Sequence, residues 1–204
     1  MCKGFEKSLF LCQKNKIEKA KKLLSESIGG KCDTPYDLFN ANRFLGFVLY
    51  AEGKLALSIE AYLAAQLYRF EDEKNYIDGF YTVSQLYYVH GEYEKSIAQA
   101  KEYFVLKREL APEQVILMAT SYYELEQYNE ALKYTLQGMQ LAELINQDIP
   151  KVWYELLWNI YFDSSDYNSA ISTARVMVQT YPEGKYQKRY AILCKKISDH
   201  KYCS

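Results

Sequence analysis

Residues 119–131, Ala-Thr-Ser-Tyr-Tyr-Glu-Leu-Glu-Gln-Tyr-Asn-Glu-Ala, contain a pattern of small and aromatic residues that returns along the chain. A small residue begins it, a pair of tyrosines follows, a polar turn ends in a third tyrosine, and a second small residue closes it. The same frame occurs at residues 46–58, 84–96 and 161–170, and in a weaker copy at residues 8–20. Equivalent positions in the five copies are Ile17, Leu55, Tyr93, Tyr128 and Tyr167, which are 38, 38, 35 and 39 residues apart. A repeat of this length predicts a stack of helix pairs.

The length of 204 residues fits one large domain or two small ones. Stacked repeats share a continuous core, so the repetition favours a single domain over residues 1–204. The predicted repeats span residues 3–30, 36–70, 74–108, 112–146 and 150–182, and a capping helix follows at residues 185–198. Because no apolar–polar alternation of period two occurs, the predicted class is all-α.

The net charge of −1 conceals an uneven distribution along the chain. Residues 1–31 and residues 185–201 each have a net charge of +5, which leaves −11 on residues 32–184. Solvated end caps are the simplest explanation of the basic ends. The long acidic middle disfavours nucleic acid as a partner, because it would repel phosphate.

Targeting signals are not evident in the sequence. No apolar run reaches membrane-spanning length, which predicts no membrane insertion, and the first residues lack the apolar core of a signal peptide. Either the protein is cytosolic, or a signal peptide has been removed and replaced by Met1.

Small residues recur where the two helices of a pair should meet. Gly46, Ser84 and Ala119 lie on the first helices of three pairs, and Ser58, Ser96, Ala131 and Ala170 lie on second helices. Small side chains let two helix backbones approach closely, while Tyr62, Leu86 and Leu132 fill the space beside them. Trp158 stands where a small residue is expected, so we expect the last pair to splay or repack.

This pattern resembles the tetratricopeptide-repeat (TPR) family over essentially the whole chain. The resemblance implies a right-handed superhelical solenoid whose concave wall consists of the first helix of each pair. A narrower resemblance rests on residues 34–36 and 42–46, Thr-Pro-Tyr and Asn-Arg-Phe-Leu-Gly, on residues 84–88, Ser-Gln-Leu-Tyr-Tyr, and on residues 150–157. These segments look like periplasmic TPR proteins that accompany TonB-ExbB-ExbD systems of Gram-negative bacteria.

The resemblance also implies which positions face a protein-binding groove. Four residues come from each first helix, and the predicted set is Asn40, Arg43, Phe47 and Tyr50, then Asp78, Tyr81, Gln85 and Tyr88, then Glu113, Ile116, Thr120 and Tyr123, then Val152, Glu155, Asn159 and Phe162. Tyr50, Tyr88, Tyr123 and Phe162 occupy one equivalent site and are predicted to form an aromatic ladder. Aromatic enrichment marks cores as well as interfaces, so the alternative is that these rings pack between repeats.

Charges on this wall are mostly acidic: Asp78, Glu113, Glu124, Glu155 and Asp163 oppose Arg43. Family members that clamp a C-terminal carboxylate use Lys, Arg and Asn here, so a carboxylate clamp is not expected. An acidic, aromatic wall predicts a protein segment with interspersed Lys or Arg and apolar residues.

No catalytic, metal or cofactor motif is recognisable in the sequence. The five cysteines lack the spacing of a zinc or redox site. In an exported protein Cys2 and Cys32 are the one expected disulfide, because both lie at the same end of the first helix pair. We therefore expect a non-enzymatic scaffold without cofactors that binds a protein or peptide in its groove, in an envelope TonB-dependent assembly. A cytosolic TPR chaperone or adaptor is the alternative, and an all-helical enzyme is the third.

Overall fold

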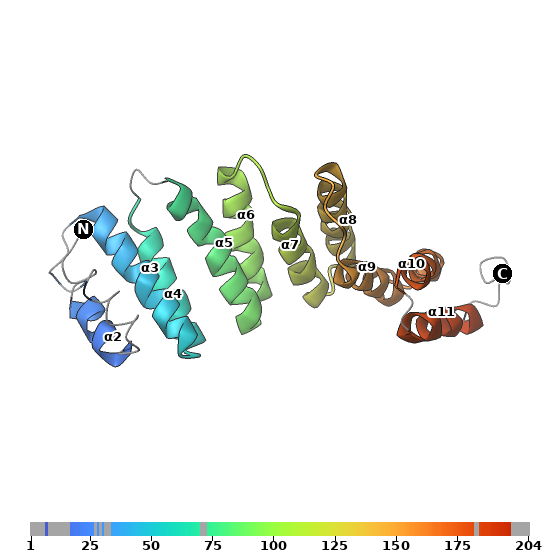
Figure 1. The fold of residues 1–204 in the computed structure, drawn as a ribbon, viewed down its shortest axis with the longest axis horizontal. Coiled ribbons are helices and arrows are strands. Elements are labelled where there is room, and N and C mark those ends of the chain that lie inside the picture. The colour runs from blue at the N-terminus through green and yellow to red at the C-terminus, as the bar shows by residue number, and fades with distance from the viewer. Residues whose placement is uncertain are drawn as a thin grey trace. The chain divides into compact units, whose positions relative to one another are not determined.

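The computed structural model describes residues 7, 17–26, 28, 30, 34–69, 73–181 and 184–196. These residues contain ten helices and no strand, which confirms the all-α class (Figure 1). The chain divides into unit 1, Met1–Arg108, and unit 2, Glu109–Ser204, and each unit is described separately. The single domain stays a prediction. The helices are α2 (Ile17–Glu26), α3 (Pro35–Ala51), α4 (Leu55–Gln66), α5 (Glu73–His90), α6 (Tyr93–Leu106), α7 (Pro112–Glu124), α8 (Tyr128–Leu144), α9 (Lys151–Asp163), α10 (Tyr167–Thr180) and α11 (Gly184–Lys196).

Unit 1 consists of helix pairs joined by short turns. Helix α3 packs along α4 and α5 packs along α6, while α4 also packs on α5 and α2 packs on α3. The core between the two pairs contains Ile59 of α4 together with Val83, Leu86 and Tyr87 of α5. Helices α3, α4 and α5 thus each pack against two neighbours, as expected for stacked repeats.

Local sequence signals account for the helix ends. Oγ1 of Thr34 accepts a hydrogen bond from the backbone N–H of Asp37 at 3.1 Å, and Pro35 occupies the first turn of α3. The turns after α3 and α5 contain Gly53 and Gly91 at φ 73° and 81°, a conformation that glycine adopts without a side-chain clash. The equivalent turns of unit 2 have Glu126 at φ 57° and Ser165 at φ 65° instead.

Small residues bring the paired helices together as the sequence predicts. A Cβ atom added to Gly46 would lie 2.5 Å from Cδ2 of Tyr62, so glycine is needed for this approach of α3 to α4. Oγ of Ser58 donates to the carbonyl oxygen of Gly46 at 2.7 Å. In the next pair, Ser84 and Ser96 each donate from Oγ to the other's carbonyl oxygen, at 2.9 and 2.8 Å. These buried hydroxyls therefore find their partners on the facing helix.

Unit 2 contains the pairs α7–α8 and α9–α10, with α11 packed on α10. Gly138 of α8 lies against Ile116 of α7, where an added Cβ would come within 2.8 Å of the isoleucine side chain. Ala170, Ile171 and Ala174 of α10 form the last core cluster with Leu193 of α11.

Trp158 changes the packing of the α9–α10 pair, as its size predicts. Its ring stacks on Phe162 of the same helix at 4.9 Å between centroids, and the guanidinium of Arg189 from α11 lies 4.6 Å from it. Helices α9 and α10 contact one another less extensively than the other pairs do. The bulky ring is thus covered from α11.

From the sequence we expect a charged linker at residues 69–75 and a helix that begins at residue 76. Helix α5 instead starts at Glu73, so part of that expected linker is helical. Of the first helix expected from the sequence, residues 5–14, the structure describes residue 7 alone, and the Cys2–Cys32 pair lies outside the described residues. Cys194 on α11 is disulfide-bonded, whereas the sequence leads us to expect a disulfide only between Cys2 and Cys32.

Candidate protein-binding surface

Helix α3 presents two exposed aromatic residues of the predicted groove. Phe47 is 56% exposed and Tyr50 is 51% exposed, three residues apart on one side of the helix. Asn40 is buried and donates from its side chain to the carbonyl oxygen of Tyr36 at 2.9 Å, so it offers no face to a partner. Nη1 of the half-buried Arg43 donates to Oδ1 of Asn75 on α5 at 3.3 Å. The exposed part of this row is therefore aromatic.

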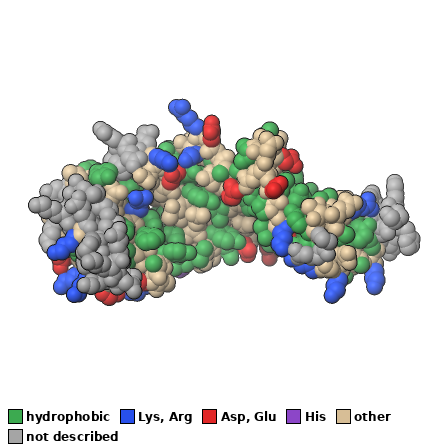
Figure 2. Space-filling view, viewed as in Figure 1, with side chains coloured by type: hydrophobic (Ala, Val, Ile, Leu, Met, Phe, Trp, Pro, Cys, Tyr) green, Lys and Arg blue, Asp and Glu red, His purple; other side chains and the backbone are tan. Residues whose placement is uncertain are grey.

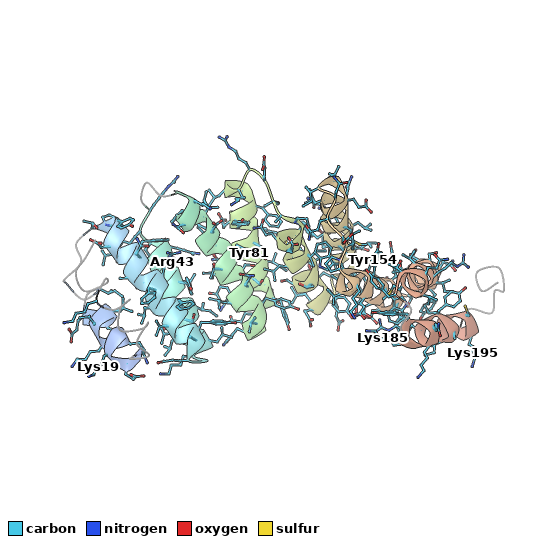
Figure 3. All side chains as sticks on the ribbon, in the orientation of Figure 1. Lys19, Arg43, Tyr81, Tyr154, Lys185 and Lys195 are labelled. Carbon is cyan, nitrogen blue, oxygen red and sulfur yellow. The ribbon has the colours of Figure 1, made fainter. Side chains whose placement is uncertain are left out.

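Helix α5 supplies the second row of predicted residues in unit 1, and Figure 3 labels Tyr81 on it and Arg43 on α3. The Tyr81 ring is half-buried against Tyr103 of α6, with 5.4 Å between centroids. Oδ1 of Asp78 accepts from Nζ of Lys107 at 3.2 Å, and this contact raises the pKa of the lysine. Gln85 is exposed. This row is thus more polar than the row on α3.

The predicted residues of α7 in unit 2 lie in three different environments. Oε1 of Glu113 accepts a hydrogen bond from Gln147 at 2.5 Å, and Oγ1 of Thr120 donates to a carbonyl of its own helix. The Tyr123 hydroxyl donates to Oδ2 of Asp163 on α9 at 2.6 Å, and burial together with this contact raises its pKa. Ile116 is only 7% exposed because it fills the space beside Gly138. Its assignment to the groove is therefore wrong: it belongs to the α7–α8 interface.

On α9 the predicted acidic residue is held by α11. Oε1 of Glu155 accepts from Nζ of Lys185 and from the Tyr186 hydroxyl, both at 2.7 Å, and these two hydrogen bonds lower the pKa of the glutamate. Val152 is exposed and Asn159 is half-buried. Glu155 therefore joins two helices of unit 2.

Three rings of the predicted ladder contact the aromatic residue that begins the next helix. Each contact joins positions five residues apart across a turn. The centroid distances are 5.6 Å for Tyr88–Tyr93, 6.0 Å for Tyr123–Tyr128 and 5.9 Å for Phe162–Tyr167. After Tyr50 the corresponding position is Leu55, and Tyr50 is the one exposed member of the four. Three of the four rings are thus half-buried against an aromatic neighbour inside their own repeat, and Tyr123 also bonds to Asp163 of the following repeat.

The expected acidic wall is partly neutralised within each unit. Asp78 meets Lys107 in unit 1, and Glu155 meets Lys185 in unit 2. Neither lysine was among the predicted site residues, because each comes from a separate segment about 30 positions away. The excess of basic residues after residue 185 was the one sequence signal for Lys185.

Neither a metal cluster nor a membrane span is found in the part of the chain that the structure describes. No group of three or more His, Cys, Asp or Glu side chains is arranged there to hold a metal ion. None of the described helices is long and apolar enough to cross a membrane.

No protein-family model matches this sequence, and no curated protein is significantly similar to it. Solved structures share its fold. A TPR protein from Parabacteroides merdae matches with a TM-score of 0.71 and 16% identity, over 96% of this chain and 72% of that protein. YrrB, described as a TPR protein with an unusual peptide-binding site, matches with a TM-score of 0.63 and 13% identity, over 88% and 86% of the two chains. MamA from Desulfovibrio magneticus matches with a TM-score of 0.64 and 11% identity, over 96% of each chain.

These similarities confirm the predicted TPR fold.

Proposed function

We propose that this protein is a non-enzymatic scaffold that binds a segment of another protein on the surface formed by α3 and α5 of unit 1. The observation that carries the proposal is the exposure of Phe47 and Tyr50 on one side of α3. Phe44, half-buried on the same helix, stacks on Phe47 at 6.2 Å and fixes one side of its ring. Aromatic side chains of this kind are common anchors of protein interfaces, because they bury a large area with few rotatable bonds.

The chemistry of this surface differs from the acidic wall that the sequence suggests. Asp78 already contacts Lys107, so it adds little net charge to the surface. Figure 2 shows hydrophobic side chains in green among the charged ones over the helices of unit 1. A partner segment with apolar side chains at intervals of three or four residues would match Phe47 and Tyr50, since these lie one helical turn apart.

The experiment is a selection of random twelve-residue peptides against the whole protein. Selected peptides are measured by fluorescence anisotropy against the wild type and the variant Phe47→Ser/Tyr50→Ser. Loss of two central aromatic anchors should weaken binding by about 30-fold or more, since each anchor contributes on the order of 1–3 kcal/mol. Circular dichroism checks that both proteins remain equally helical.

Leu57→Ser is the matched control, because Leu57 is 49% exposed on α4, the second helix of the same pair. It removes similar exposed apolar area and should leave binding unchanged. Equal loss in both variants, or full binding by Phe47→Ser/Tyr50→Ser, would refute the assignment to α3.

The cellular setting is a separate part of the proposal. The resemblance to TPR proteins of TonB-ExbB-ExbD systems suggests a periplasmic scaffold in an envelope assembly. The alternative is a cytosolic TPR chaperone or adaptor. The first thirty codons of the full gene separate the two: an encoded signal peptide excludes the cytosolic alternative, and its absence, together with recovery in the cytosolic fraction, excludes the periplasmic one.

A further inference from the structure

A hollow in unit 2 lies where α8 ends, α9 begins and α10 ends. Its walls include Glu143, Gln147, Asp148, Ile149, Tyr154 and Tyr181, and its volume is about 480 Å³. This volume lies within the usual range of sites for small groups. Because the hollow belongs to unit 2, its occupancy does not depend on the aromatic surface of α3 in unit 1.

Two tyrosine rings make an aromatic corner in this hollow. Tyr154 of α9, labelled in Figure 3, and Tyr181, which follows α10, have ring centroids 6.3 Å apart and planes inclined at 61°. The Tyr181 hydroxyl donates to the carbonyl oxygen of Ile149 at 3.0 Å, and its ring also contacts Tyr186. The ring of Tyr181 is therefore fixed from two sides, and the corner exists before any ligand arrives.

The rim of the hollow is negatively charged. Glu143 and Asp148 are exposed and form no ion pair among the residues that the structure describes. Glu113 adds a third carboxylate through its hydrogen bond to Gln147. Figure 2 shows acidic side chains in red around α7 and α8. Burial, and the nearby charges of Tyr181 and Glu143, raise the pKa of Tyr154, so its ring stays neutral at physiological pH.

No internal cation of the described segments occupies this corner. Lys185, the lysine of α11 that lies over a tyrosine ring, is 4.7 Å from Tyr186 and bonds to Glu155 instead. Neutral ring faces attract cations, and two nearby carboxylates strengthen that attraction. The same carboxylates would repel an anion.

We propose that this hollow binds the cationic end of a Lys or Arg side chain from a bound protein segment, with the cation against Tyr154 and Tyr181 and between Glu143 and Asp148. The hydrocarbon part of the side chain would lie along the rings, which leaves the backbone of the segment at the rim. A free small amine shares the charge of the ligand but lacks this backbone.

The test uses the whole protein and four probes. Three are capped peptides of Ala and Gly with one central Lys, Arg or norleucine, and the fourth is butylammonium. Aromatic NMR signals of Tyr154 and Tyr181 report binding at this site. The Lys and Arg peptides should shift both signals. Raising the salt concentration from 50 to 300 mM should weaken the binding of these two peptides, as expected for exposed charges. The norleucine peptide should leave the signals in place.

The variant Glu143→Gln/Asp148→Asn keeps the rings and removes the two charges. This variant should bind the Lys peptide about five- to tenfold more weakly, and its affinity should depend less on salt. The control Glu126→Gln/Glu130→Gln removes two charges at the start of α8, at the far end of that helix from the hollow, and should change affinity by less than about twofold, because distant charges are screened.

Three outcomes would overturn the proposal. One is equal binding of the norleucine and Lys peptides, and another is equal weakening by the two charge variants. The third is butylammonium binding as tightly as the Lys peptide, which would identify a free amine rather than a protein segment as the ligand.

Discussion

A comparison of two glycines in unit 1 tests whether close approach of paired helices fixes the repeats. Gly46 of α3 and Gly79 of α5 both lie inside first helices, and each is changed to alanine. An added Cβ at Gly46 would lie 2.5 Å from Cδ2 and 2.7 Å from Cε2 of Tyr62, whereas at Gly79 it would meet nothing within 4 Å.

The magnitudes follow from two opposing effects. Alanine is favoured over glycine in a helix interior by about 1 kcal/mol, so Gly79→Ala should stabilise the protein by about 0.5–1 kcal/mol. At Gly46 the same gain is opposed by overpacking of about 1–3 kcal/mol. The free energies of unfolding of the two variants should therefore differ by about 1–3 kcal/mol.

Urea unfolding followed by circular dichroism measures this difference on the whole chain. In a Tyr62→Leu background the ring is gone, so Gly46→Ala should become neutral or stabilising. Equal stability of Gly46→Ala and Gly79→Ala would refute the reasoning, as would a Gly46→Ala penalty that persists without the Tyr62 ring.

Three further predictions concern hydrogen bonds and pH. Ser84→Ala removes one of two reciprocal hydroxyl bonds between α5 and α6 and should cost about 0.5–1.5 kcal/mol in urea unfolding, with Lys101→Ala on the exposed side of α6 as a near-neutral control. Hydrogen bonds from Lys185 and Tyr186 lower the folded-state pKa of Glu155. The stability that ionised Glu155 contributes is therefore present above its unfolded pKa of about 4.3 and is lost as pH falls through the lower folded pKa. Glu155→Gln should make the urea midpoint depend less on pH between pH 6 and 3, and an unchanged pH dependence would contradict this. Burial and the Asp163 carboxylate raise the pKa of Tyr123. The stability that the neutral Tyr123 hydroxyl contributes is therefore present below pH ~10 and is lost at higher pH. Tyr123→Phe should lose less stability than the wild type between pH 8 and 10.5, and an equal loss in both proteins would show that other groups are responsible.

The fold was predictable because its signals are local. Small residues such as Gly46 and Ser84 mark the helix interfaces, and the sequence also places Tyr62 beside the first of these, where the structure has it. Thr34, Pro35 and the glycine turns are equally local marks of the helix ends. The early start of α5 was missed because Glu73 and Lys74 resemble a charged linker when their contacts in the fold are not known.

The candidate surface was less predictable because its chemistry depends on distant contacts. The wall carboxylates Asp78 and Glu155 meet Lys107 and Lys185, which come from other segments. The spacing of the tyrosine frame gave no sign that a ring such as Tyr88 would turn toward the start of the next helix. Exposure of Phe47 and Tyr50 emerged only when the neighbouring side chains were in place.

The turns of unit 2 offer a route to engineering this protein. Glu126 and Ser165 adopt positive φ without being glycine, and both side chains are exposed. An ordinary residue in this conformation carries strain on the order of 1–2 kcal/mol, part of which glycine would relieve. Glycine at positions 126 and 165, as in the equivalent turns of unit 1, should therefore give a more stable scaffold without changing its packed side chains.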